Sequence, residues 1–231
     1  MNSHSQNIKT KPPVILGLEA SGEHASVVVT RGDDVLQELR LEQRHGHASQ
    51  FVPLVKECLV NAELAFADLD IIAAGVGPGS FTGLRVCLSA AKGFAIAGGL
   101  TSIGVNGLRA RAFGAQRQMP DNVSDIISCA DTRRGSLFYQ RFDCQLEAKS
   151  EIAEATLEEL MSIAKDDILC LPPIDDFDET AATINQNVHI VPMSASDIAR
   201  VAFMDFQASR PLPPLDPLYV VAPKLGPSKS A

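Results

Sequence analysis

A glycine-rich stretch is the feature of this sequence that most limits what the chain can fold into. Residues 73–99 read AAGVGPGSFTGLRVCLSAAKGFAIAGG, an apolar strand, a turn and then a helix of small residues. Many phosphate-binding loops have this layout, because glycines let the backbone approach a nucleotide and the helix N-terminus attracts negative charge. The stretch therefore predicts either a phosphate cradle or a tight strand-to-helix turn.

The spacing of the glycines argues against both standard phosphate loops. A Walker loop ends in G-K-[ST], whereas Gly83 is followed by Leu84 and Arg85. A dinucleotide loop reads G-x-G-x-x-G after the first strand, whereas GPGSFTG has one residue too many and follows the fourth predicted strand. We expect a structural turn whose glycines allow close backbone approach and whose hydroxyl caps the helix, with ligand contact as the alternative. The residues predicted to present the helix are Gly77, Pro78, Gly79, Ser80, Thr82 and Gly83.

The helix predicted over residues 84–98 is apolar around more than half of its circumference. Only Arg85, Ser89 and Lys92 mark a polar stripe. A helix that packs on one sheet needs an apolar face of roughly 100°, so the excess surface must be covered by a neighbouring helix or by another chain. Two interpretations remain open: a central core helix, and one half of a helix bundle that a second chain completes.

The remaining hydrophobic pattern predicts an α/β fold of two similar halves. In the first half, this pattern predicts strands at 14–20, 25–31, 34–42, 70–76 and 101–105, with an amphipathic helix at 47–65 and the small-residue helix at 84–98. The second half predicts a helix or link at 106–118, strands at 125–131, 135–143, 144–152, 167–171 and 188–192, and two capped helices that begin near Thr156 and Ser194. The order β-β-β-α occurs in both halves, which indicates a duplicated fold with two mixed sheets and flanking helices.

Composition excludes several classes of protein. The chain of 231 residues carries 28 acidic and 20 basic side chains, a net charge of −8, which argues against strong autonomous binding to nucleic acid. Five cysteines without C-x-x-C spacing predict reduced, buried thiols in a cytoplasmic protein. Residues 1–13 are polar and predict a disordered leader, and because no run of about 18 apolar residues exists, we expect no membrane span.

The sequence predicts no catalytic residue and no metal site. His45 and His47 are too close for a helical zinc pair, and Ser80 lacks the G-x-S-x-G context of a nucleophile. The segment at 131–135 predicts a hairpin turn with charge at its tip. Its two arginines, together with one on the small-residue helix, are candidates for contact with an anion such as a nucleic-acid phosphate: Arg85, Arg133 and Arg134.

Several stretches, in order and spacing, resemble the TsaB (YeaZ) family. GVGPGSFTGLR resembles its G-x-G-P-G-S-F-T-G-x-R motif, and LGLEASGEHASVVV its first hairpin. HASQFVPLV resembles the start of its first helix, IISCADTRRGSLFYQRF its A-x-D-A-R-[RM]-G-E-V-Y strand pair, and PLDPLYVV its C-terminal P-x-Y-L-R. The similarity extends over about residues 14–221.

The resemblance implies an actin-like (ASKHA) fold with subdomains at residues 14–106 and 107–231. It also implies a non-catalytic subunit that supports a TsaD-like transferase in forming N6-threonylcarbamoyladenosine at position 37 of tRNAs reading ANN codons. A TsaE-like ATPase would dock on that pair, tRNA would bind through the complex, and the chain alone would form a homodimer. No cofactor is expected on this chain alone, since ATP would be used by the partner complex. The residues expected at the partner or dimer interface are Phe51, Val55, Cys58, Leu84, Leu88, Ala91, Phe94 and Ala95.

Three positions depart from the family pattern. Glu19 stands where Asp is usual, Ser136 where Glu is common, and Val221 in place of an arginine. The alternative function is a standalone ASKHA-type ATPase, a sugar-kinase-like enzyme or a glycoprotease-like hydrolase. A nucleotide enzyme of this fold needs a second glycine-rich phosphate motif, and residues 107–231 contain no G-G or G-x-G pair. That absence disfavours the alternative.

Overall fold

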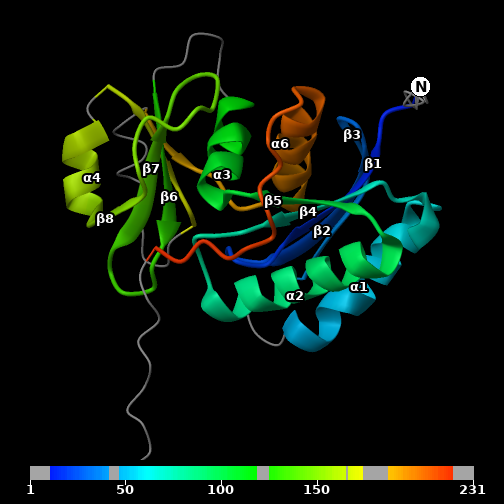
Figure 1. Cartoon of the computed structure of the whole chain (residues 1–231). Helices are drawn as coiled ribbons and strands as arrows, with labels where there is room; N and C mark the ends of the chain where they lie inside the picture. The colour runs from blue at the N-terminus through cyan, green and yellow to red at the C-terminus, as the bar shows by residue number, and fades with distance from the viewer. Residues whose placement is uncertain (1–10, 42–46, 119–124, 165, 174–186, 221–231) are drawn as a thin grey trace, which may run out of the picture.

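The chain forms two five-stranded mixed sheets that stand side by side, with helices on their faces (Figure 1). The computed structural model describes residues 11–41, 47–118, 125–164, 166–173 and 187–220. The elements of the first half are β1 (Val14–Glu19), β2 (Ala25–Arg31), β3 (Asp34–Leu41), α1 (His47–Asn61), η1 (Phe66–Asp68), β4 (Ile71–Gly75), α2 (Phe81–Gly98) and β5 (Thr101–Val105). Those of the second half are α3 (Gly107–Gln116), β6 (Ile126–Asp131), β7 (Leu137–Phe142), β8 (Ala153–Ala155), α4 (Leu157–Ala164), β9 (Ile168–Leu171), β10 (Val188–Ile190) and α6 (Ala195–Gln207).

The two sheets have the same topology. The first runs β3-β2-β1-β4-β5 and the second, read in the matching direction, β8-β7-β6-β9-β10. In each sheet the opening hairpin is antiparallel and the later strands join in parallel, with Leu16 beside Ile72 in the first and Ile127 beside Leu169 in the second. The predicted duplication and the α/β fold class are therefore confirmed, although no residue-level repeat marks them.

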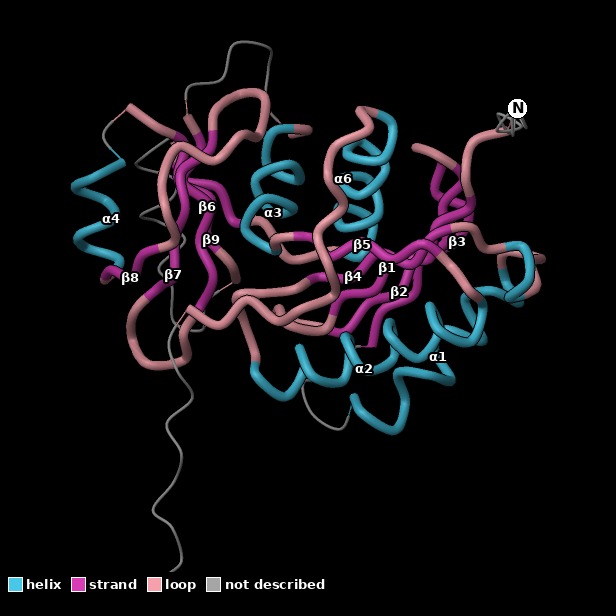
Figure 2. The backbone as a smooth tube through the Cα atoms, in the orientation of Figure 1, coloured by secondary structure: helices cyan, strands magenta, loops and turns pink. Residues whose placement is uncertain are grey.

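The helix that follows the last strand of each sheet packs on the other sheet. Helices α1 and α2 cover one face of the first sheet and α6, which follows β10, covers the opposite face. Helix α3 follows β5 but packs on the second sheet, whose other face is covered by α4. Figure 2 shows α3 and α6 next to each other between the sheets. The expected boundary at residue 106 thus separates the two sheets, whereas α6 returns to the first.

The third strand of the second sheet is not where the sequence predicted it. Residues 144–152 form a turn and an extended loop, and the strand that pairs with β7 is β8 at Ala153–Ala155. One oxygen of the Asp143 carboxylate accepts hydrogen bonds from the backbone N–H groups of Gln145 and Glu147, both at 2.9 Å. Leu146 takes a positive φ of 61° and buries its side chain. This local turn competes with strand pairing, and the alternating pattern of residues 144–152 did not reveal it.

Helix boundaries follow local capping. The hydroxyl of Thr156 accepts from Glu159 N–H at 3.2 Å and the Glu159 carboxylate accepts from Thr156 N–H at 2.8 Å, which is the predicted capping box. Ser194 caps α6 as predicted, and α1 begins at His47 with Pro53 inside it. Four cysteines are buried and Cys144 is exposed, all of them unpaired. The leader and the tail after Val220 lie outside the described residues apart from 11–13.

No helix among the described residues is long and apolar enough to span a bilayer.

The glycine turn places α2 directly against the first hairpin. Gly77 has a φ of 94°, which favours glycine, and the Ser80 hydroxyl accepts from Gly83 N–H at 3.3 Å, so that α2 begins at Phe81 rather than at Leu84. Ser80 N–H donates to Ser21 O at 2.7 Å. A Cβ at Gly79 would overlap Ser21 O, and one at Gly83 would overlap Ala20 O. Because the glycine turn and the first hairpin touch through their backbones, these two positions have no room for a side chain.

Glu19 holds the other side of this contact. It is fully buried at the end of β1, and its Oε1 accepts from Ser21 N–H at 2.5 Å, Ser21 Oγ at 2.7 Å and Gly22 N–H at 3.0 Å. Its Oε2 lies against Gly75 and has no hydrogen-bond partner among the described residues. Burial raises the pKa of Glu19 above its ordinary value, although the hydrogen bonds from Ser21 and Gly22 oppose the rise.

Two alanine substitutions on α2 should change stability in opposite directions. Gly83→Ala should lower the free energy of unfolding by about 3 kcal/mol, because backbone, not a movable side chain, blocks the new Cβ. Gly93→Ala should raise the free energy of unfolding by about 0.5–1 kcal/mol, because the added Cβ would meet nothing within 4 Å and alanine favours a helix. Urea denaturation of both variants measures this. If both variants were destabilised equally, the position of α2 would not depend on the close approach of Gly83 to the first hairpin.

The raised pKa of Glu19 predicts a pH-dependent stability. Above the ordinary value of 4.5 the folded state retains a proton that the unfolded state has lost, so stability falls as pH rises towards the folded pKa. Relative to Glu19→Gln, the native chain should therefore lose stability between pH 4.5 and pH 8. Urea denaturation of both proteins across this range tests the sign, and parallel profiles would contradict a raised pKa.

Candidate functional site

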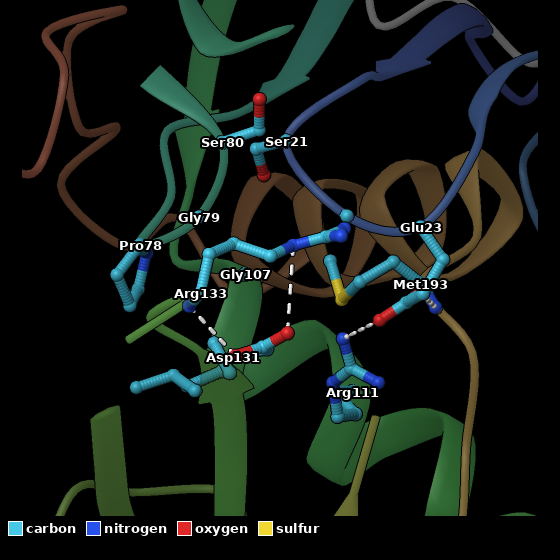
Figure 3. Close-up of a pocket in the computed structure, with 13 residues that line it drawn as sticks. Ser21, Glu23, Pro78, Gly79, Ser80, Gly107, Arg111, Asp131, Arg133 and Met193 are labelled. Carbon is cyan, nitrogen blue, oxygen red and sulfur yellow. Dashed lines mark hydrogen bonds and ion pairs between the residues drawn. The ribbon is translucent and has the colours of Figure 1, made fainter. Parts of the chain in front are cut away.

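A small polar cleft lies between the two halves of the chain. The first hairpin turn, the glycine turn, the start of α3 and the turn between β6 and β7 surround it (Figure 3). The residues that line it are Ser21, Gly22, Glu23, Pro78, Gly79, Ser80, Gly107, Leu108, Arg111, Ala130, Asp131, Arg133 and Met193. Its volume of about 20 Å³ is room for about one water molecule, far less than a nucleotide needs.

A buried ion pair crosses the cleft. One terminal nitrogen of Arg111, on α3, lies 2.8 Å from Glu23 Oε1 in the first hairpin turn, and the other donates to Val191 O. The second carboxylate oxygen of Glu23 accepts from Met193 N–H at 2.9 Å. Burial alone would raise the pKa of Glu23, but the charge of Arg111 and these hydrogen bonds outweigh it and lower the pKa. The pair joins the first sheet to α3 and to the segment that leads into α6.

The three arginines predicted to contact an anion lie apart from one another. Arg133 extends across the mouth of the cleft (Figure 3) and pairs with Asp131, whose other oxygen accepts from Arg133 N–H at 2.7 Å. Arg134 pairs with Glu154 at 3.5 Å, next to the second sheet. Arg85 stands on α2 with its guanidinium 3.9 Å from the centre of the Phe81 ring. Of the three, only Arg133 lines the cleft.

Sequence reasoning missed the residues that close the cleft. Glu23 stands in a short polar link and Arg111 in a helix of mostly small residues, 88 positions apart. Helix α3 carries two arginines, Arg109 and Arg111, and nothing in the sequence distinguishes the one that pairs with Glu23 from the one that pairs with Asp205. No local pattern connects Glu23 with Arg111, because the fold alone brings their elements together.

Most of the residues predicted at the interface lie inside the chain's own core. The buried ones pack against the first sheet: Phe51, Val55, Cys58, Leu84, Leu88 and Ala91. Phe94 and Ala95 are half-buried beside them. The apolar arc of α2 is wide because it meets both the sheet and α1, and its fully buried centre includes Ala91.

Other residues of the same two helices face solvent. Val52 and Val60 on α1 are 52% and 64% exposed, and Ile96 on α2 is 83% exposed. On α2, a Cβ added at Gly93 would meet no atom within 4 Å, so this position is also open to solvent. Figure 1 shows α1 and α2 side by side on the outer side of the first sheet. We call the exposed surface formed by Val52, Val60, Gly93 and Ile96 the helix face.

Comparison with known proteins shows what the chain is similar to. A family model described as TsaD, tRNA N6-adenosine threonylcarbamoyltransferase, matches residues 34–206. The protein named tRNA threonylcarbamoyladenosine biosynthesis protein TsaB from Escherichia coli K12 is 30% identical over 128 residues, 55% of this chain and 54% of that protein. The protein of the same name from Haemophilus influenzae is 31% identical over 127 residues, which are 55% of this chain and 52% of that protein. The chain thus spans about half the length of the curated relatives it matches.

Solved structures agree with the fold. YeaZ from Pseudomonas aeruginosa superposes with a TM-score of 0.69 over 90% of this chain and 100% of that one, at 21% sequence identity. A second Pseudomonas aeruginosa structure, described as similar to peptidase YEAZ, gives a TM-score of 0.71 with the same coverage and identity. The chain therefore has the actin-like α/β fold of these proteins. Because the family model matches well over half of its residues, the chain belongs to the TsaD family, and proteins named TsaB are among its relatives.

Proposed function

We propose that this chain is a non-catalytic subunit that binds a TsaD-like transferase and supports it in forming N6-threonylcarbamoyladenosine at position 37 of tRNAs reading ANN codons. Two similarities support the proposal: the relatives are named as threonylcarbamoyladenosine biosynthesis proteins, and the matching family model describes the transferase itself. The cytoplasm, where tRNA is modified, is the proposed location.

The helix face is the observation that carries the proposal. Its apolar side chains project from two helices whose other sides are fixed in the core, and no described residue covers them. Exposed apolar surface on rigid elements is typical of a protein interface. We propose that the TsaD-like subunit binds here, and that the chain alone forms a homodimer through the same surface.

The closed cleft supports a role without nucleotide on this chain. In an enzyme of this fold a nucleotide would lie between the two hairpin turns, a place that Glu23 and Arg111 fill here. We therefore assign ATP use to the partner complex, with a TsaE-like ATPase as a further subunit, and tRNA binding to the complex as a whole. The same cleft argues against a standalone ATPase or sugar kinase, and no observation favours a hydrolase.

A charge placed on the helix face should weaken association without unfolding the chain. Ile96→Glu should raise the Kd for a TsaD-like partner about 100-fold, because the interface would bury an unpaired carboxylate. Isothermal titration calorimetry with the purified partner measures the Kd. Urea denaturation should show unchanged stability, since the side chain is exposed.

Phe206→Glu is the matched control. Phe206 is an exposed apolar residue on α6, across the first sheet from the helix face. Its substitution should leave the Kd unchanged. Equal affinities for the native chain and Ile96→Glu would rule out the helix face as the partner surface.

A further inference from the structure

After α6 the chain returns along the first sheet as an extended segment, residues 208–220, which we call the C-terminal segment (Figure 1). Backbone hydrogen bonds hold it: Gly104 N–H donates to Pro213 O and Leu218 N–H donates to Val76 O, both at 2.8 Å. Leu215 is buried in the core of the first sheet. Lys92 Nζ lies 3.0 Å from Asp216 Oδ1, which ties the segment to α2. The segment is therefore fixed rather than loosely attached.

The C-terminal segment ends in an exposed aromatic contact with α2. The rings of Tyr219 and Phe81 lie 5.7 Å apart with a 38° tilt, although the two residues are 43% and 40% exposed. The guanidinium of Arg85 lies over the Phe81 ring, 3.9 Å from its centre. We call Phe81, Arg85 and Tyr219 the aromatic cluster.

The aromatic cluster continues into the helix face. Positions 85, 89, 92 and 96 follow the spacing i, i+4, i+7, i+11, which places them on one stripe of a helix. All four are exposed. The stripe runs along α2 from Arg85 at the cluster to Ile96 at the helix face, so the two form one continuous surface.

We propose that the aromatic cluster anchors the interface with the transferase-type subunit, which would present a carboxylate to Arg85 beside an apolar surface. The inference rests on the proposed function. Tyr and Arg are the residue types that contribute most to binding when they are held rigidly and then buried. The guanidinium of Arg85 is held in place by the ring, and no carboxylate among the described residues pairs with it.

The charge distribution favours a protein over RNA as the occupant. An RNA ligand needs a basic footprint, but the chain has a net charge of −8 and the charge of Lys92 is already offset by Asp216. A single guanidinium next to two rings instead matches one carboxylate in an apolar setting. The proposed partner surface is therefore apolar with one acidic residue.

The test compares two single substitutions in the full chain by calorimetric titration with the TsaD-like subunit. Tyr219→Ala and Arg85→Glu should each raise the Kd about 30-fold, and the effect of Arg85→Glu should shrink as salt is raised. Both residues are exposed, so urea denaturation should show native stability. Phe206→Ala and Arg40→Glu are the controls, at exposed positions on α6 and on β3; each should leave the Kd unchanged.

The outcomes separate this inference from the proposed function. If Ile96→Glu weakens binding while both cluster substitutions leave it unchanged, the anchor is wrong and the proposed function stands. If the native chain shows no binding to the transferase subunit, the proposed function fails and the inference fails with it. If the cluster substitutions weaken only self-association, seen by light scattering, or only tRNA binding, seen by filter retention, the occupant is another molecule and the inference is overturned.

Discussion

The direct contact between two backbones, the first hairpin turn and the glycine turn, determines where α2 lies. Ser80 N–H donates to Ser21 O, and side chains at Gly79 or Gly83 would overlap the hairpin carbonyls. The glycines therefore serve the approach of the chain to itself, not to a phosphate. Because α2 is held so close, one arc of it becomes core and the opposite arc becomes an exposed surface. The helix face and the aromatic cluster both depend on this placement.

A second constraint joins the two sheets. Arg111 and Glu23 form a buried ion pair at the centre of the molecule, and the segment that leads into α6 adds one hydrogen bond to each, through Val191 O and Met193 N–H. Removing one partner of such a pair leaves a buried charge and is strongly destabilising. Together with the packing of α3 on the second sheet and of α6 on the first, the pair connects the two halves. The cleft between them is occupied by the chain's own side chains.

Much of the fold was predictable because it follows local patterns, whereas the site depends on contacts distant in sequence. Alternating strands, the Thr156 and Ser194 caps and the repeated β-β-β-α order are local. The strand expected at 144–152 was wrong because one side chain, Asp143, stabilises a turn. The sequence left the outward arc of α2 undetermined for a different reason. A helix that is apolar around most of its circumference does not reveal which arc meets the sheet, and no local pattern pairs Glu23 with Arg111.

Glu19 explains why a departure from the family pattern leaves this architecture intact. Its carboxylate does not line the cleft; it turns back to accept hydrogen bonds from the hairpin that follows it. That hairpin supplies Ser21 O, the acceptor for the glycine turn, so the buried carboxylate supports the contact that positions α2. Burying an acid without a partner for one oxygen is unfavourable at neutral pH. This unfavourable burial is localised beneath the turn, where the same side chain supports the contact that positions α2.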